Sequence, residues 1–161
     1  ILDTYYPDKS LQKIIIDILD EFEKEMKYRP FQDAIEFVDK LNANNIPACI
    51  VTSSSMLKMN NAFEQLPGFK EKFNGLVTGD MVKNCKPDPE GYLLGAETIG
   101  IKPENCIVFE DSLQGIQAGL NAGSKVVALT TTVSRDKIEK LKANKIIDNF
   151  AGLEIDDIIA L

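Results

Sequence analysis

Hydrophobic residues recur at steps of three and four positions along the first part of the chain, and this spacing predicts two helices. Over residues 10–27 an apolar stripe alternates with charged positions, which is the pattern of a long amphipathic helix. A second helix of the same kind is predicted over residues 31–41. The segment "KYRPFQ" at 27–32 separates them, because Pro30 ends one helix and can begin the next.

Short apolar runs follow, each bounded by polar or turn-forming residues and separated from the next run by a helical pattern. They predict strands at 46–51, 75–79, 105–109, 125–129 and 145–147. The segments between them predict helices at 55–66, 88–99, 112–122 and 134–143. Strands that alternate with helices imply right-handed crossovers and a parallel sheet. The predicted fold class is therefore α/β, with a Rossmann-like parallel sheet that carries helices on both faces.

Composition sets limits on size, partners and location. With 161 residues, 44% of them hydrophobic, the chain can form one domain with a packed core, or one domain and a piece of another. The formal charge of −7 argues against a nucleic-acid surface, which needs clustered Lys and Arg. No apolar run approaches the ~20 residues that cross a bilayer, so no membrane partner is expected. The three cysteines lack metal-ligand spacing and suit the reducing cytoplasm.

The absence of histidine narrows the chemistry further. It excludes Ser-His-Asp and Cys-His catalysis within this sequence, together with every zinc site that uses histidine. Catalysis by these residues would therefore depend on carboxylates, lysine and hydroxyl groups. A hard metal ion bound through oxygen would be compatible with that set.

Polar residues follow three of the predicted strands, either directly or in the loop after the strand. The strand at 46–51 is followed by the hydroxyl run 52–55, Lys86 lies in a loop after the next strand, and Glu110 and Asp111 end the strand at 105–109. Parallel sheets bind ligands outside the carboxyl ends of their strands. We therefore expect Thr52, Lys86 and Asp111 to converge at one edge of the sheet.

Each of these groups also has an ordinary structural explanation. Hydroxyl runs before helices are usually N-caps, a single loop lysine is usually solvated, and acidic residues are common in turns. Their combination points to chemistry. Hydroxyls and helix N–H groups hold phosphate oxygens, lysine neutralises phosphate charge, and paired carboxylates bind Mg²⁺ through oxygen. Together they predict a phosphoryl-transfer site, in which a cation would relieve the repulsion between Glu110 and Asp111.

The segments "IVTSS", "CKPDPEGY" and "IVFEDSLQGIQAG", in this order, resemble motifs II, III and IV of the haloacid dehalogenase superfamily. Within it, the similarity is to β-phosphoglucomutase-like and phosphoglycolate phosphatase-like enzymes, and it covers essentially residues 30–161. The resemblance implies that Thr52, with Ser53 beside it, binds the transferring phosphoryl group and that Lys86 is the motif III lysine. It also implies that Glu110 and Asp111 bind Mg²⁺.

The sequence departs from the family pattern in one respect. The family's nucleophile is the first Asp of a D-x-D motif that ends the first strand, and no such motif follows an apolar strand here. In the family that strand is central, between the strands that end at Thr52 and at Asp111. We therefore expect residues 1–161 to be the C-terminal part of a longer polypeptide and not to be catalytic alone. Residues 1–28 would be the end of a helical cap domain, and 29–161 a core that lacks its first strand.

The resemblance implies an Mg²⁺-dependent phosphatase of a small phosphorylated metabolite, which works through an aspartyl-phosphate on an Asp outside this chain. A sugar phosphomutase of the β-phosphoglucomutase type is an alternative, because that choice depends largely on the cap. A non-catalytic protein of the same fold is a second alternative. Haloalkanoate dehalogenation is disfavoured by Glu110 and Asp111, since that branch of the family lacks this acid pair.

Overall fold

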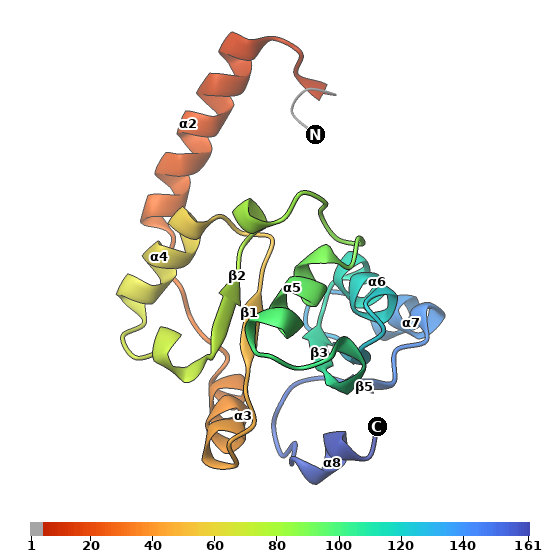
Figure 1. Ribbon diagram of the computed structural model, residues 1–161. Helices are drawn as coiled ribbons and strands as arrows, with labels where there is room; N and C mark the ends of the chain where they lie inside the picture. The colour runs from red at the N-terminus through yellow and green to blue at the C-terminus, as the bar shows by residue number, and fades with distance from the viewer. Residues whose placement is uncertain (1–4) are drawn as a thin grey trace.

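The computed structural model describes residues 5–161 and confirms the α/β class with parallel strands (Figure 1). The strands form two sheets. In one, β1 (Cys49–Val51) pairs with β2 (Gly75–Val77). In the other, β3 (Ile107–Glu110) pairs with β4 (Lys125–Leu129), which pairs in turn with β5 (Lys145–Ile147). The predicted strands are therefore all present, although most are shorter than their apolar runs.

The helices alternate with the strands in the predicted order. They are α2 (Lys9–Glu25), α3 (Gln32–Ala43), α4 (Met56–Gln65), α5 (Glu90–Thr98), α6 (Leu113–Asn121), α7 (Arg135–Ile138) and α8 (Asp156–Ile159). Short 3-10 turns lie at Lys70–Lys72, Gly79–Met81, Pro103–Asn105 and Glu139–Leu141. The helix predicted at 134–143 is wrong in length, because α7 passes into the last of these turns. Lys142 then adopts a left-handed conformation with a φ of 60°, which ends this 3-10 turn.

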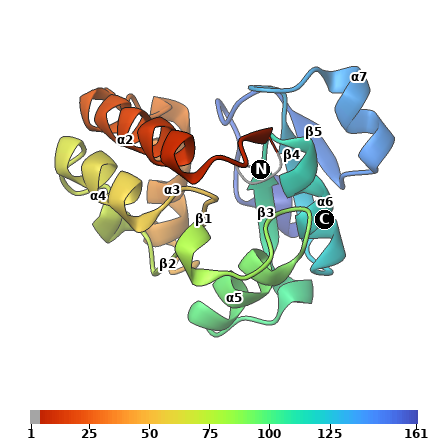
Figure 2. The same ribbon diagram turned by 90° about the horizontal axis from the view of Figure 1, so that it is seen from above.

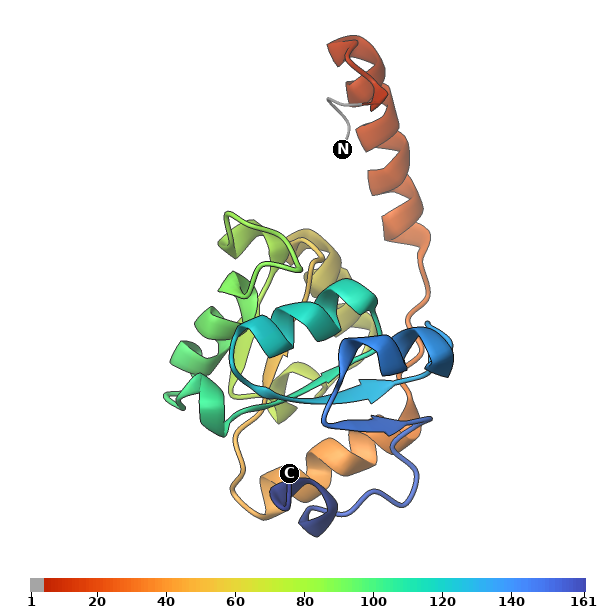
Figure 3. The same ribbon diagram turned by 90° about the vertical axis from the view of Figure 1, so that its right-hand side faces the viewer.

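Helices cover both faces of the β3–β4–β5 sheet, as Figure 3 shows. Successive residues of a strand point to opposite faces, and β4 divides its apolar side chains in this way. Val127 packs with Phe37 and Leu41 of α3, whereas Val126 packs with Ile116 of α6 on the other side. Each such fully buried side chain contributes about 1.5–3 kcal/mol. This two-sided core holds β3, and the acid pair at its end, in a fixed position.

The inner edges of the two sheets have no strand partner among the described residues. β1 pairs only with β2, and β3 pairs only with β4. Figure 2 shows the β1–β2 sheet beside the β3–β4–β5 sheet. The ends of β1 and β3 are nevertheless connected through one side chain, because Lys86 contacts both Val51 and Glu110.

Helix α2 projects from the body of the molecule and approaches it through α4 (Figures 1 and 3). Its N-cap is Asp8, whose carboxylate accepts the backbone N–H of Ser10 at 2.8 Å. Most of the apolar stripe predicted along this helix faces outward: Ile14, Ile18 and Phe22 are 54, 60 and 64% exposed. Among residues 5–161, no helix is long and apolar enough to span a membrane. The boundary at residue 28 between a cap segment and the core stays a prediction. The first four residues of that predicted cap segment lie outside the described residues.

Candidate functional site

Lys86 and Glu110 form an ion pair at the carboxyl ends of the strands. The Nζ of Lys86 lies 2.5 Å from Oε1 of Glu110, and the two side chains are only 16 and 10% exposed. Lys86 also donates to the hydroxyl of Tyr92 at 2.9 Å and to the carbonyl of Val51 at 3.5 Å. Since Val51 is the last residue of β1 and Glu110 the last of β3, the lysine bridges the ends of the two sheets.

Glu110 accepts hydrogen bonds on both carboxylate oxygens. Oε1 accepts from Lys86 and, at 2.9 Å, from the Tyr92 hydroxyl. Oε2 accepts from the backbone N–H groups of Asp111 and Ser112, both at 2.9 Å, and from the Ser112 hydroxyl at 3.0 Å. Burial by itself would raise the pKa of this carboxyl, but the bonds from Lys86 and Ser112 outweigh it and the pKa lies below its ordinary value. Glu110 is therefore held as a carboxylate with its acceptor positions filled.

Asp111 is held differently, by a loop that follows β4. Its Oδ2 accepts hydrogen bonds from the hydroxyls of Thr131 at 2.9 Å and Thr132 at 2.5 Å. Its Oδ1 has no hydrogen-bond donor among the residues that the structure describes. Asp111 lines a pocket of about 250 Å³ that also contains Phe109 and Asn149. One oxygen of Asp111 is therefore available to a cation.

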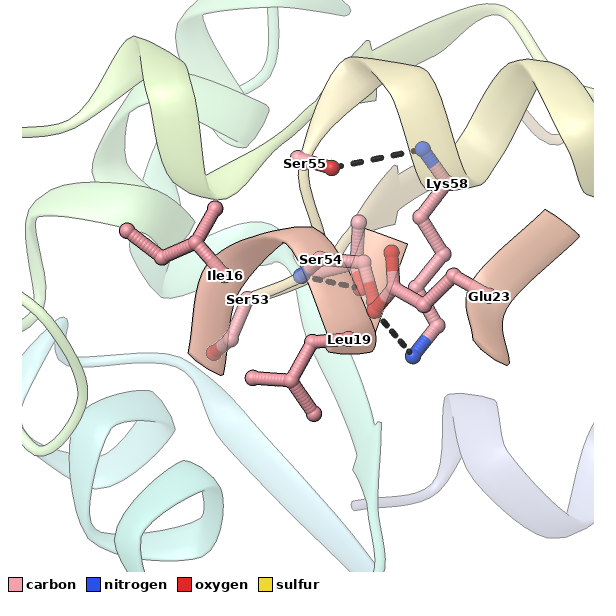
Figure 4. Close-up of a pocket in the computed structure, with 8 residues that line it drawn as sticks. Ile16, Leu19, Glu23, Ser53, Ser54, Ser55 and Lys58 are labelled. Atoms are coloured by element: carbon pink, nitrogen blue, oxygen red, sulfur yellow. Dashed lines mark hydrogen bonds and ion pairs between the residues drawn. The ribbon is translucent and has the colours of Figure 1, made fainter. Parts of the chain in front are cut away.

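Thr52 and Ser53 line a second pocket, of about 450 Å³, between the end of β1 and helix α2 (Figure 4). Ile16 and Leu19 of α2 supply apolar lining to this pocket, and the hydroxyl run 52–55 supplies polar lining. The pocket combines a polar side that suits an oxyanion with an apolar side that suits a carbon skeleton.

The charges at this pocket are already paired within the protein. The Nζ of Lys58 lies 3.2 Å from a carboxylate oxygen of Glu23, so that an ion pair joins α4 to α2. The first turn of α4 is capped by Ser55, whose hydroxyl accepts the N–H of Lys58 at 3.3 Å. The carboxylate of Asp80 takes the N–H of Met56 at 2.6 Å. An oxyanion in this pocket would therefore meet chiefly the hydroxyl and amide groups that precede α4.

Local sequence explains why the chain turns sharply after β3. Ser112 is the N-cap of α6, and its hydroxyl accepts the N–H of Gly115 at 3.0 Å. Gly115 leaves the space that the Glu110 side chain occupies, because a Cβ at position 115 would lie 1.9 Å from Oε1 of Glu110. The small residue in "EDSLQG" is therefore required by its close contact with Glu110.

The structure brings some of the predicted site residues together and leaves others apart. Lys86 and Glu110 are in direct contact, and Asp111 follows Glu110. Thr52 follows Val51, which Lys86 contacts, but the described residues show no hydrogen bond between Thr52 and Lys86. The Thr52 hydroxyl instead accepts the N–H of Ser54 at 3.1 Å.

The sequence singled out Lys86, but not three other residues whose side chains hold the acid pair. Tyr92 belongs to the quoted segment "CKPDPEGY", and Thr131 and Thr132 follow the strand at 125–129. A signal for the threonines was present, because they too follow the carboxyl end of a predicted strand. No local signal indicated that Tyr92 would reach Glu110, since this contact depends on how α5 packs beside β3.

The acid pair meets the requirements of a divalent cation only in part. Carboxylate oxygens are suitable ligands for Mg²⁺, and Oδ1 of Asp111 is available. Both oxygens of Glu110 are occupied by five donors, so direct ligation would require one of them to leave. Within residues 5–161, no group of three acidic, histidine or cysteine residues is placed to hold a metal ion.

Comparison with known proteins supports a family assignment. The model of the haloacid dehalogenase-like hydrolase family matches residues 2–123. Hexitol phosphatase A of Escherichia coli is 37% identical over 110 residues, which is 67% of this chain and 49% of that protein. The chain thus spans about half the length of this relative.

Solved structures agree with the fold. A haloacid dehalogenase hydrolase of family IA from Entamoeba histolytica superposes with a TM-score of 0.82 at 23% identity, over 94% of this chain and 69% of that one. A putative β-phosphoglucomutase from Thermotoga maritima superposes with a TM-score of 0.72 at 26% identity, over 91% of this chain and 69% of that one. The first of these supports the fold alone, and the second extends the likeness to the phosphoglucomutase-like branch.

Proposed function

Because the chain belongs to the haloacid dehalogenase-like hydrolase family, we propose that it carries part of the active site of an Mg²⁺-dependent phosphatase of small phosphorylated metabolites. The observation that carries this proposal is the position of Lys86, which connects the end of β1 to the carboxylate at the end of β3. A partly buried ammonium group at the carboxyl edge of parallel strands is suited to neutralise a phosphoryl group.

We assign the phosphoryl oxygens to Thr52, Ser53 and Lys86. The two hydroxyl residues and the amide groups before α4 would donate hydrogen bonds, and the lysine would supply the positive charge. The nucleophile is proposed to be an Asp outside this chain. Its carboxylate oxygen would form a bond to phosphorus while the ester oxygen leaves, and water would then release phosphate from the aspartyl-phosphate.

The proposed metal ligand within this chain is Asp111, through the oxygen that Thr131 and Thr132 leave free. When bound, Mg²⁺ would supply positive charge that stabilises the phosphoryl oxygens. Direct binding of Mg²⁺ by Glu110 stays a prediction. The five hydrogen bonds that Glu110 accepts disfavour it. Its proposed contribution is a negative charge beside Lys86 and Asp111.

A phosphatase is favoured over a phosphomutase by the relative of higher identity, which is named as a hexitol phosphatase. The phosphomutase alternative is supported by the likeness to a putative β-phosphoglucomutase. The substrate class proposed is a sugar phosphate or a similar compound, which the polar and apolar walls of the Thr52 pocket would suit. The proposed location is the cytoplasm, in keeping with three free cysteines.

The test is an assay of the full-length gene product against an aryl phosphate and a panel of sugar phosphates, with Mg²⁺ and with a chelator. A phosphatase releases inorganic phosphate from them, whereas a mutase converts one sugar phosphate into its isomer. We expect phosphate release that depends on Mg²⁺ and is abolished by Asp111→Asn.

The matched control is Asp39→Asn, which makes the same change of charge. Asp39 pairs with Lys72, which precedes β2 and so lies at the amino edge of the sheet, away from the site. This control should retain full activity. Unchanged turnover in Asp111→Asn, or equal loss in both variants, would refute the assignment of Asp111.

A further inference from the structure

The hydroxyl of Tyr92 lies between the two charged groups of the site. It accepts a hydrogen bond from Nζ of Lys86 at 2.9 Å and donates one to Oε1 of Glu110 at 2.9 Å. Together with the direct contact between Lys86 and Glu110, these bonds form a closed triangle of three polar groups. The phenol is the one neutral member of this triangle.

The ring of Tyr92 is fixed by packing that does not involve the hydroxyl. It lies in the first turn of α5 and packs against the core cluster that contains Val108 of β3 and Ile116 of α6. Burial, and then the negative charge of Glu110, raise the pKa of the phenol, so that the hydroxyl keeps its proton. It can therefore donate to Glu110 permanently while its oxygen accepts from Lys86.

The three hydrogens of the Lys86 ammonium group are used unequally. Glu110 and Tyr92 take two of them at 2.5 and 2.9 Å. The third is directed at the carbonyl of Val51 over 3.5 Å, which is at the limit of a hydrogen bond. This weakly held hydrogen lies at the end of β1, beside Thr52. An incoming phosphoryl oxygen could accept this hydrogen, because only the weak bond to Val51 would be lost.

We propose that Tyr92 is a positioning residue, which together with Glu110 fixes the direction of the Lys86 ammonium group so that one of its hydrogens faces the end of β1. A flexible lysine with a single partner could rotate about its side chain, whereas two short bonds at different angles define its orientation. The kinetic part of the test rests on the proposed function, and a second measurement does not.

The kinetic test is a double-mutant cycle in the full-length gene product, with Tyr92→Phe, Lys86→Met and both together. Tyr92→Phe keeps the packed ring and removes the hydroxyl. It should lower kcat about ten-fold and change KM by less than about two-fold, because the lysine would act on the transition state. In the Lys86→Met background the same change should have no further effect.

The second measurement needs no substrate. The ¹H–¹⁵N signal of the Lys86 ammonium group, assigned by its loss in Lys86→Met, should be visible at low temperature because its hydrogen bonds slow exchange with water. It should be lost in Tyr92→Phe. The matched control is Tyr28→Phe, since the hydroxyl of Tyr28 is buried without a hydrogen-bond partner among the described residues. That variant should leave both the signal and kcat unchanged.

The outcomes separate the two proposals. Additive losses in the cycle, or a Lys86 signal that persists in Tyr92→Phe, would overturn the positioning role. If the unaltered protein turns over no phosphorylated compound, the proposed function fails and the ammonium signal alone decides on Tyr92. Loss of that signal in Tyr92→Phe would then support the inference, and persistence would overturn it.

Discussion

The carboxylate of Glu110 occupies the space beside Gly115 that any other residue would fill with its side chain. A Cβ at position 115 would lie 1.9 Å from Oε1 and 2.4 Å from Oε2 of Glu110. The acid cannot easily move away, because Lys86, Tyr92 and the start of α6 hold both of its oxygens. Position 115 is therefore coupled to the site, although it carries no chemical group of its own.

The first prediction concerns Gly115→Ala. Alanine would favour the helix by about 0.5–1 kcal/mol, but it would displace Glu110, whose bonds to charged or buried partners are worth about 1.5–3 kcal/mol each. We expect the free energy of unfolding to fall by about 2 kcal/mol. The thermal midpoint should then be lower than that of the unaltered protein by roughly 5 °C. Activity of the full-length product should fall with it.

Gly91→Ala in α5 is the control for this change. A Cβ there would lie 3.3 Å from a methyl group of Val51, which needs only a small adjustment. Its effect on the thermal midpoint should be small. A Gly115→Ala protein that is as stable and as active as the unaltered one would show that Glu110 has room to move.

The second prediction concerns Thr132, whose hydroxyl donates to Asp111 at 2.5 Å. Thr132→Val keeps the shape of the side chain and removes that hydrogen bond. If Asp111 holds Mg²⁺, the concentration of Mg²⁺ that gives half-maximal activity should rise about ten-fold, as for other partners that orient a metal ligand. Thr98→Val is the control, because the Thr98 hydroxyl donates to the carbonyl of Leu94 in its own helix. An unchanged Mg²⁺ dependence in Thr132→Val would count against this role.

The third prediction concerns the segment that connects α2 to the rest of the protein. Gln65 of α4 binds this segment through both polar atoms of its side-chain amide. Its Nε2 donates to the carbonyl of Met26 at 2.9 Å, and its Oε1 accepts the N–H of Tyr28 at 3.2 Å. Gln65→Ala removes both bonds and should speed tryptic cleavage after Lys27 several-fold by local opening.

The comparison for Gln65→Ala is Gln117→Ala in α6, because among the described residues Gln117 donates only to Asn121 of the same helix. Cleavage after Lys27 should be as slow in this variant as in the unaltered protein, and mass spectrometry of the fragments identifies the site. Equal cleavage rates in Gln65→Ala and the unaltered chain would mean that the ion pair between Glu23 and Lys58 suffices to hold α2.

The fourth prediction concerns the unpaired edges of β1 and β3. Strands that are unpaired at an edge offer N–H and C=O groups to other chains. Residues 1–161 expressed alone should therefore self-associate or be poorly soluble, as measured by light scattering after gel filtration. The full-length gene product, in which we propose that a further strand lies between β1 and β3, serves as the comparison. A monomeric 1–161 with a cooperative melting transition would contradict this expectation.

Local patterns were sufficient to predict the order of helices and strands. Apolar runs such as "KVVAL" and caps such as Ser55 and Ser112 depend on neighbouring residues only, and the structure has strands and helices at those places. The helix at 134–143 was predicted too long: α7 ends at Ile138, and a 3-10 turn follows that ends at Lys142, whose left-handed conformation is not marked by a glycine.

The sequence by itself determined the α/β class, the family and the set of residues at the strand ends, because these depend on spacing along the chain. Only the tertiary structure decided which of them meet. Tyr92 reaches Glu110 across 18 positions, and Thr132 reaches Asp111 across 21. Such contacts depend on how α5 and the loop after β4 pack beside β3, and no local pattern encodes the angle between two packed elements. The sequence therefore predicted the acid pair and Lys86 beside it, but not the contact of Tyr92 with Glu110.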